Sequence, residues 1–258
     1  MQSLAKTLNQ EGNRGEALPE LFKRFTENGI RFRRGGVCMI AGVPGSFKTM
    51  LTLALADDWK RPTLYFSNDS DETTVARRLI ARRMRVDTDR VEEQMTKDPK
   101  WASAQLSGID HIKWNFSSNP TLPEIEEEIQ AFMEMYGQPP EVVVVDVLMK
   151  VNYMEDSDLG SFTRIVDFLT SIARDYSACV ILVHHASEAV QGNPVPPRWA
   201  ILQKIAQLPS LILNVAPQPW SGDLAICAVK NRNGKQDPSG KDYFTLRANP
   251  AQCWFEDY

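Results

Sequence analysis

The chain has few cysteines and histidines, which limits the kinds of site it can form. Of its 258 residues, four are cysteine and three are histidine. The cysteines stand singly among apolar residues, with no Cys-x-x-Cys spacing, at Cys38, Cys179, Cys227 and Cys253. We therefore expect buried free thiols in a reducing compartment and no structural zinc site.

The sequence also lacks a long apolar run and an excess of positive charge. No segment is apolar for long enough to cross a bilayer, and the first residues, MQSLAKTLNQEGNRGE, lack the apolar core of a signal peptide. The formal net charge is -4, so contact with a nucleic acid has to be local. The composition is that of a globular protein with a sizeable core, and we expect a cytoplasmic protein with no membrane partner.

Apolar runs rich in β-branched residues alternate with helical patterns. Nearly continuous apolar runs indicate strands covered on both faces, as in a parallel sheet. The predicted strands are 37–42, 63–67, 141–146, 179–184, 210–215, 224–230 and 243–247, and the predicted helices are 48–58, 72–85, 122–136 and 159–176. This alternation predicts a three-layer α/β fold with a mostly parallel central sheet, in which the late strands form an antiparallel edge.

The segment AGVPGSFKTML at residues 41–51 nearly matches the phosphate-binding loop G-x-x-x-x-G-K-[ST]. It follows an apolar strand and opens an apolar helix, where loop amides and a helix N-terminus together bind an anion. A simple turn between strand and helix would not explain a Lys-Thr pair at this offset. Lys48 is expected to reach the β- and γ-phosphates of ATP, and the Thr49 hydroxyl to bind Mg²⁺. The predicted nucleotide-binding residues are Gly42, Val43, Pro44, Gly45, Ser46, Phe47, Lys48, Thr49 and Met50.

Phe47 occupies the second glycine position of this loop. Its Cβ stands where glycine normally lets the backbone approach the phosphates closely. If φ of Phe47 is negative, the amides that hold the phosphates stay in place and the ring points away. We then expect Phe47 to affect catalysis more than binding.

Two carboxylates follow predicted strands. Asp146 ends the buried run EVVVVD, where a charge has to meet a cation or water. Beside a phosphate-binding loop, this position predicts the Walker B carboxylate that holds Mg²⁺ through its water shell, and the alternative is a helix N-cap. Asp69, in YFSNDSDETT, is placed to orient the attacking water as a general base. Asp71 and Glu72 are explained by capping of the next helix.

The order of these motifs resembles the RecA-like ATPase core of DnaB-type replicative helicases over about residues 28–248. FSNDS stands where that family has a catalytic glutamate, and Asp69 matches it. VILVHHASE is similar to the strand that ends in the γ-phosphate sensor, usually glutamine, and His185 falls there. AVKNRNGKQDPSG resembles the family's K-x-R-N-G-x-x-G segment. The resemblance implies that Lys230 and Arg232 reach the nucleotide of a neighbouring subunit. The departures at Phe47, Asp69 and His185 bear on ATP turnover more than on ATP binding.

The resemblance implies an ATP- and Mg²⁺-dependent DNA motor, a helicase or translocase that forms a homo-oligomeric, hexameric ring and serves replication, recombination or repair. Residues 1–30 are polar with one amphipathic stretch at 18–25, which indicates an N-terminal arm before an ATPase domain at 31–258. We expect no counterpart of the separate N-terminal domain of bacterial DnaB proteins. This is typical of ATPase cores encoded by bacteriophages, which act in the host cytoplasm. The family's pore loops correspond to about residues 150–161 and 186–204. Their candidate contacts to single-stranded or structured DNA are Lys150, Arg198, Trp199 and Lys204.

Several alternatives remain open at this point. A metal-dependent DNA nuclease could use Asp69, Asp71, Glu72 and Asp146 to hold one or two metal ions. A regulatory ATPase without enzymatic output is another possibility. The basic run at residues 77–85 is interpreted as a set of solvated or ion-paired arginines. Lys230 and Arg232 could instead cap an edge strand and pair with Asp237 or Asp242.

Overall fold

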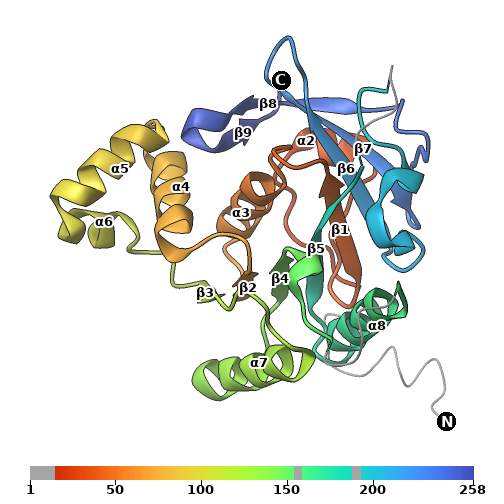
Figure 1. Cartoon of the computed structure of the whole chain (residues 1–258), viewed down its shortest axis with the longest axis horizontal. Helices are drawn as coiled ribbons and strands as arrows, with labels where there is room; N and C mark the ends of the chain where they lie inside the picture. The colour runs from red at the N-terminus through yellow and green to blue at the C-terminus, as the bar shows by residue number, and fades with distance from the viewer. Residues whose placement is uncertain (1–14, 154–158, 188–192) are drawn as a thin grey trace.

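The structure is a computed structural model that describes residues 15–153, 159–187 and 193–258, and a nine-stranded sheet runs through these residues (Figure 1). The strand order is β3-β2-β4-β5-β1-β6-β7-β8-β9. The strands are β1 Val37–Gly42, β2 Thr63–Ser67, β3 Ile112–Asn115, β4 Val142–Asp146, β5 Cys179–His185, β6 Leu211–Pro217, β7 Leu224–Asn231, β8 Phe244–Asn249 and β9 Trp254–Glu256. The strands from β3 to β6 pair in parallel and those from β6 to β9 pair antiparallel, which confirms the predicted fold class.

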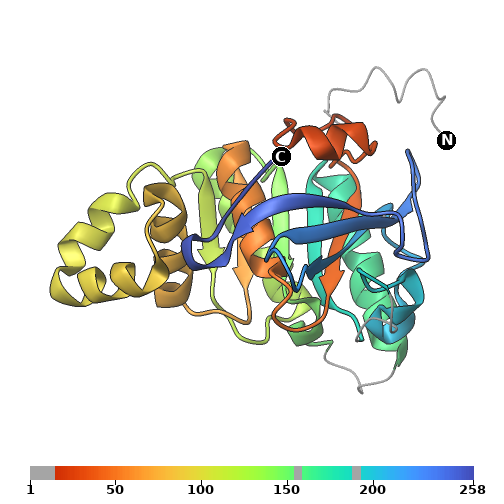
Figure 2. The ribbon, with the colours of Figure 1, turned by 90° about the horizontal axis from the view of Figure 1, so that it is seen from above.

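Alternate residues of the central strands face two separate cores. Val142 and Val144 of β4 pack in the core with α3 (Lys48–Trp59), whereas Val143 and Val145 pack in the core with α7 (Leu122–Tyr136) and α8 (Leu159–Asp175). This follows from the two-residue period of a strand. Figures 1 and 2 show α3 on one side of the sheet and α7 and α8 on the other. The continuous valine run therefore reflects burial on both faces, as predicted.

Three further helices lie outside this three-layer core or at its margin. α4 (Glu72–Met84) follows β2, and α5 (Thr88–Lys97) and α6 (Pro99–Gln105) continue beside it (Figure 1). The sequence analysis missed α5, α6, β3 and β9. Only Val91 is buried in α5, and most other positions are polar or charged, so the helix has too few apolar residues to stand out in the sequence.

The described part of the N-terminal arm packs into the core with α3. Leu18, Phe22 and Phe25 are buried there, and α2 (Lys23–Glu27) begins where the Asp257 carboxylate accepts hydrogen bonds from backbone amides. The division at residue 30 stays a prediction.

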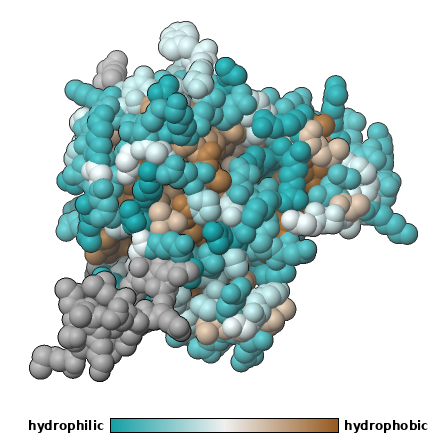
Figure 3. Space-filling view, turned by 180° about the vertical axis from the view of Figure 1, so that it is seen from behind, coloured by the Kyte–Doolittle hydropathy of each residue, from teal (hydrophilic) through white to brown (hydrophobic). Residues whose placement is uncertain are grey.

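The face in Figure 3 is mainly hydrophilic, and hydrophobic side chains show in recesses between hydrophilic ones. Among the described residues, no helix has the length and apolarity to span a membrane.

Candidate active site

The loop between β1 and α3 lines a cavity of about 380 Å³ at the carboxyl end of the parallel strands. Residues 44–50 form one wall of this cavity. The other lining residues are Asp69, Ser70, Arg78, Val147, His185, Pro250 and Cys253. The fold thus brings the ends of β2, β4 and β5 to the phosphate-binding loop, as expected for a parallel sheet with a ligand at its carboxyl edge.

Gly42 is fixed by its surroundings. A Cβ at this position would lie 2.4 Å from Ser46 Oγ and 2.5 Å from the carbonyl oxygen of Val215. No side chain fits there. The first glycine of the predicted loop is therefore required by packing against β6.

Phe47 has a left-handed backbone, with φ 63° and ψ 18°. The negative φ considered from the sequence is wrong, because the chain has to turn sharply from the loop into α3 and the position keeps the conformation of glycine. This conformation costs about 1–2 kcal/mol for a residue with a Cβ. The half-buried ring packs against the core that contains α3, which offsets part of that cost.

Lys48 lies inside the loop. Its ammonium donates hydrogen bonds to the Val43 carbonyl oxygen at 2.7 Å and to Ser46 Oγ at 3.4 Å. Burial lowers the pKa of Lys48 to about 8, although the negative charges of Asp146 and Asp69 act to raise it. A phosphate oxygen could replace the Val43 carbonyl oxygen as the acceptor for the Lys48 ammonium, because the side chain already points into the loop.

Thr49 and Asp146, the two predicted metal-binding residues, are in contact. Thr49 Oγ1 donates to Asp146 Oδ1 at 3.1 Å, and the Tyr65 hydroxyl donates to Oδ2 at 2.8 Å. Asp146 is only 2% exposed, and burial raises its pKa to about 6 although both hydrogen bonds act in the opposite direction. It caps no helix, since Val147 is the N-cap residue of the following turn. A hydroxyl and a buried carboxylate are oxygen ligands of the kind that Mg²⁺ prefers, so the pair fits this metal.

Asp69 lies at the rim of the same cavity, and its side chain is 52% exposed. Its carboxylate forms an ion pair with Lys150, with 2.8 Å between Nζ and Oδ1. Lys150, predicted as a DNA contact, is therefore part of the active-site rim in this structure. Asp71 accepts a hydrogen bond from the Thr74 amide at 2.8 Å, so it caps α4 as the sequence indicated.

His185 ends β5 and faces the cavity. Burial and the nearby charge of Lys48 lower the pKa of His185, so the imidazole is neutral and one ring nitrogen can donate to an oxyanion. Its Nδ1 is buried without a partner among the described residues. An unpaired buried nitrogen at a cavity wall fits the predicted role as a phosphate sensor. The neighbouring His184 is fully buried and lies 3.1 Å from the Leu202 carbonyl oxygen.

Lys230 and Arg232 lie at the opposite end of the sheet from the phosphate-binding loop. Lys230 of β7 pairs with Ile212, near the start of β6, and the Arg232 amide donates to Ser210. The Lys230 ammonium is held by the carbonyl oxygens of Ala206 and Gln207, and burial lowers its pKa to about 8.

Arg232 is exposed, with Nη2 3.4 Å from the Gln207 carbonyl oxygen. β7 lies between β6 and β8, but its pairs with β8 end at Ile226, so Lys230 lies beyond them. In the described residues neither basic residue pairs with Asp237 or Asp242.

The remaining DNA candidates are exposed on a well-held segment. Arg198 and Trp199 lie in a short 3-10 helix, and Trp199 is 69% exposed. The Arg198 amide donates to the Pro238 carbonyl oxygen at 2.9 Å, which fixes the turn. Lys204 is exposed in the next turn. Parts of both predicted pore loops, residues 154–158 and 188–192, lie outside the described residues.

Arg78 lines the cavity, a position that the sequence analysis missed. Its guanidinium donates to Ser70 Oγ at 3.2 Å. Residues four apart lie on one face of a helix. Thr74 and Arg78 share such a face of α4, and Ser70, four residues before Thr74, continues the same line just before the helix begins. That spacing is the sequence signal that could have identified Arg78.

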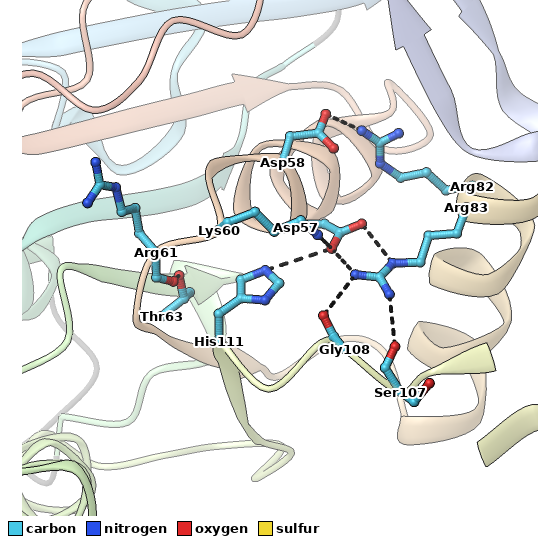
Figure 4. A network of polar contacts seen from close by, with 10 residues as sticks. All are labelled: Asp57, Asp58, Lys60, Arg61, Thr63, Arg82, Arg83, Ser107, Gly108 and His111. Atoms are coloured by element: carbon cyan, nitrogen blue, oxygen red, sulfur yellow. Dashed lines mark hydrogen bonds and ion pairs between the residues drawn. The ribbon is translucent and has the colours of Figure 1, made fainter. Parts of the chain in front are cut away.

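The other arginines of the basic run behave as predicted. Arg82 pairs with Asp58, and Arg83 pairs with Asp57 (Figure 4). Burial alone would raise the pKa of Asp57, but hydrogen bonds from Arg83 and Lys60 bring it to about 2. This network fixes α4, and with it Arg78, relative to α3.

The four carboxylates of the nuclease alternative do not form one metal-binding group in the described part of the chain. No three Asp, Glu, His or Cys side chains gather there as a metal-binding group. Asp71 is engaged as a helix cap, and Asp69 pairs with Lys150.

Comparison with known proteins gives a family and two phage relatives. Residues 28–191 match the AAA_25 family of AAA domains. The Gene 65 protein of Mycobacterium phage L5 is 30% identical over 259 residues, which is 95% of this chain and 95% of the phage protein. The Gene 65 protein of Mycobacterium phage D29 is 31% identical over 220 residues, covering 81% of this chain and 93% of its own length. These relatives agree with the predicted phage origin.

Two solved structures share the fold. An ATPase domain solved on its own superposes with a TM-score of 0.81 at 14% identity, covering 99% of this chain and 96% of that domain. A DnaB-like replicative helicase, solved in a study of its interactions with primase, superposes with a TM-score of 0.80 at 16% identity, covering 98% of this chain and 66% of the helicase chain. The resemblance to the DnaB-like P-loop ATPase core is thereby confirmed for the fold.

Proposed function

The chain belongs to the AAA_25 family of AAA domains, and on that premise we propose that it is an ATP- and Mg²⁺-dependent motor that acts on DNA. One observation carries the proposal. Lys48, Asp69 and His185 surround a single cavity, at which Thr49 also meets the buried carboxylate of Asp146. These side chains come from separate parts of the sequence and together supply what phosphoryl transfer to water needs.

Each group has a role in the proposed reaction. Lys48 moves its hydrogen bond from the Val43 carbonyl oxygen to the β- and γ-phosphates. Thr49 and Asp146 would hold Mg²⁺, and this ion would supply positive charge to neutralise the phosphate oxygens. Asp69 orients a water molecule and accepts its proton as the water oxygen attacks the γ-phosphorus and ADP leaves. His185 donates a hydrogen bond to a γ-phosphate oxygen.

Arg78 adds a positive charge within the same subunit. It lies on α4, and the ion pairs of Arg82 and Arg83 fix that helix relative to α3. A guanidinium at the cavity wall is suited to a developing oxyanion. We include Arg78 in the phosphate-binding set for this reason.

Arg232 is the candidate for a charge supplied by a neighbouring subunit. The six residues of β1 span about 20 Å at roughly 3.3 Å per residue, so Arg232 cannot reach the loop of its own chain. Lys230 is the weaker candidate, because two backbone carbonyls already hold its ammonium. A head-to-tail contact would bring Arg232 to the next cavity. Such contacts close into a ring or continue as a filament, and we propose a hexameric ring.

DNA contact is assigned to Arg198, Trp199 and Lys204. A fixed turn that exposes one indole and one guanidinium is suited to base stacking and phosphate contact. The DNA process served is replication, recombination or repair in the host cytoplasm.

The test is phosphate release from ATP with Mg²⁺, with and without a single-stranded oligonucleotide. Wild-type protein should release phosphate, and Lys48→Ala should not. Nucleotide release from labelled DNA, measured in parallel, should be absent. A wild-type protein that degrades DNA and leaves ATP intact would reject the proposal.

A further inference from the structure

Lys150 joins the ends of two neighbouring strands. It ends the 3-10 turn Leu148–Lys150 that follows β4, and its ammonium contacts Asp69 beyond the end of β2. The distance from Nζ to Asp69 Oδ1 is 2.8 Å, and the Asn68 carbonyl oxygen lies 3.3 Å from the same Nζ. The ammonium is therefore held by the residue assigned as the general base and by the backbone beside it.

The backbone on both sides of this ion pair is fixed. Leu148 is fully buried, and the Asn68 amide donates to the Asp146 carbonyl oxygen at 2.7 Å. The pair itself is open to solvent, since the Lys150 side chain is 41% exposed and that of Asp69 is 52% exposed. The ion pair can therefore break without any movement of the sheet, and a solute can reach the ammonium.

The contact opposes the chemistry assigned to Asp69. A general base has to take a proton from the attacking water through a free carboxylate oxygen, and the Lys150 ammonium already occupies one oxygen of Asp69. It also holds Oδ1 toward Lys150. As long as the pair is intact, Asp69 is a poor acceptor for the proton of the attacking water.

We propose that Lys150 restrains Asp69 in the DNA-free protein, and that a DNA phosphate frees Asp69 by taking over the Lys150 ammonium. The proposal rests on the proposed function as a DNA-stimulated ATPase. A phosphate oxygen is the natural competitor, because an exposed lysine on a protein of net charge -4 pairs with whichever anion lies nearest. Lys150 is thus a positioning residue that acts through Asp69. Its ammonium can pair with the Asp69 carboxylate or with a DNA phosphate, but not with both at once.

The restraint is small in energy, which makes it suitable for a switch. Exposed ion pairs are worth about 0.2–1 kcal/mol, so loss of this pair should leave the fold intact and raise DNA-free turnover by about 1.4- to fivefold. A pair that only stabilised the fold would not change the ratio between DNA-stimulated and DNA-free rates.

The test uses the full chain with Lys150→Ala, and Lys150→Arg as the matched variant that keeps the charge. Phosphate release from ATP is measured across a concentration series of a single-stranded oligonucleotide, and thermal unfolding checks the fold of each protein. Lys150→Ala should release phosphate faster than wild type without DNA, and DNA should stimulate it less. Lys150→Arg should keep the wild-type ratio.

The outcomes separate the two proposals. A DNA-free rate of Lys150→Ala equal to or below that of wild type would overturn the restraint and leave the ATPase assignment standing. Equal wild-type rates with and without DNA would also overturn it. Absence of phosphate release from every protein under both conditions would reject the proposed function, and the restraint with it.

Discussion

The hydroxyl of Thr49 lies 3.1 Å from Oδ1 of Asp146, although 97 positions separate the two residues in the chain. The first follows the phosphate-binding loop, and the second ends the valine strand β4. Their contact joins the start of α3 to the carboxyl end of β4.

Replacing Lys48 with alanine should abolish ATP binding and leave the fold intact. The side chain donates only within the loop, and the lowered pKa shows that burial disfavours its charge. Lys48→Met should therefore unfold at a higher temperature than wild type in nucleotide-free buffer. Calorimetry measures the ATP affinity of Lys48→Ala, and thermal unfolding measures the stability of Lys48→Met. Unchanged ATP affinity in Lys48→Ala would contradict the phosphate-binding role.

ATP affinity should fall as the pH rises above about 8. In the free protein burial lowers the pKa of Lys48 from 10.5 to about 8, whereas bound phosphates require the ammonium. Above this pH the lysine has to take up a proton when ATP binds, so ATP affinity decreases by up to about tenfold per pH unit. Below this pH Lys48 is already charged, and its protonation no longer changes the affinity. Titrations from about pH 7 to about pH 9 test this. Lys48→Arg keeps its charge throughout and should give a flat profile.

Phe47→Gly should leave ATP affinity within about tenfold of wild type and change hydrolysis more, because backbone amides hold the phosphates. Glycine removes the cost of the left-handed backbone, but the ring's packing against the core is lost as well. Phe47→Ala is the matched control, since it loses the ring and keeps the Cβ. If Phe47→Gly binds ATP and wild type does not, the side chain blocks the loop.

Arg78→Ala should lower ATP turnover on the order of 10- to 100-fold, the contribution of one hydrogen bond to a charged group. The neighbouring Arg77→Ala is the control, because Arg77 pairs with Glu92 and does not line the cavity. Steady-state phosphate release compares the two. Equal losses in both variants would mean that helix stability, and not contact with phosphate, explains the effect.

Arg232→Ala subunits should recover activity when mixed with Lys48→Ala subunits. Each variant lacks one half of the shared site, and cations supplied in trans contribute about 10³–10⁵ in rate. Phosphate release as a function of mixing ratio measures the recovery. Full activity of Arg232→Ala in a sample shown to be monomeric would exclude the trans role and remove the main support for a ring.

The sequence allowed prediction of most of the sheet, because its central strands carry continuous apolar runs that only a doubly covered sheet can bury. Val142–Asp146 and Cys179–His185 are examples. It also placed Asp146 beside Thr49, since the carboxyl ends of parallel strands share one edge. What it could not show were contacts decided by side-chain direction. Lys150 turns toward Asp69, and Arg78 stands on one particular face of α4.

Phe47 shows a different limit. The sequence marked the position as unusual but could not give its backbone angle, because the turn into α3 is imposed by β1, β6 and the helix together. Glycine-like φ at a phenylalanine is visible only in three dimensions.

The wall that Pro250 and Cys253 add to the cavity has a practical consequence for expression of the protein in fragments. These residues come from the last turn of the chain, far beyond every motif and beyond the family match at residues 28–191. A fragment cut at that match would keep each named motif up to His185. It would expose β1 along the edge where β6 pairs, and that bare strand would favour precipitation.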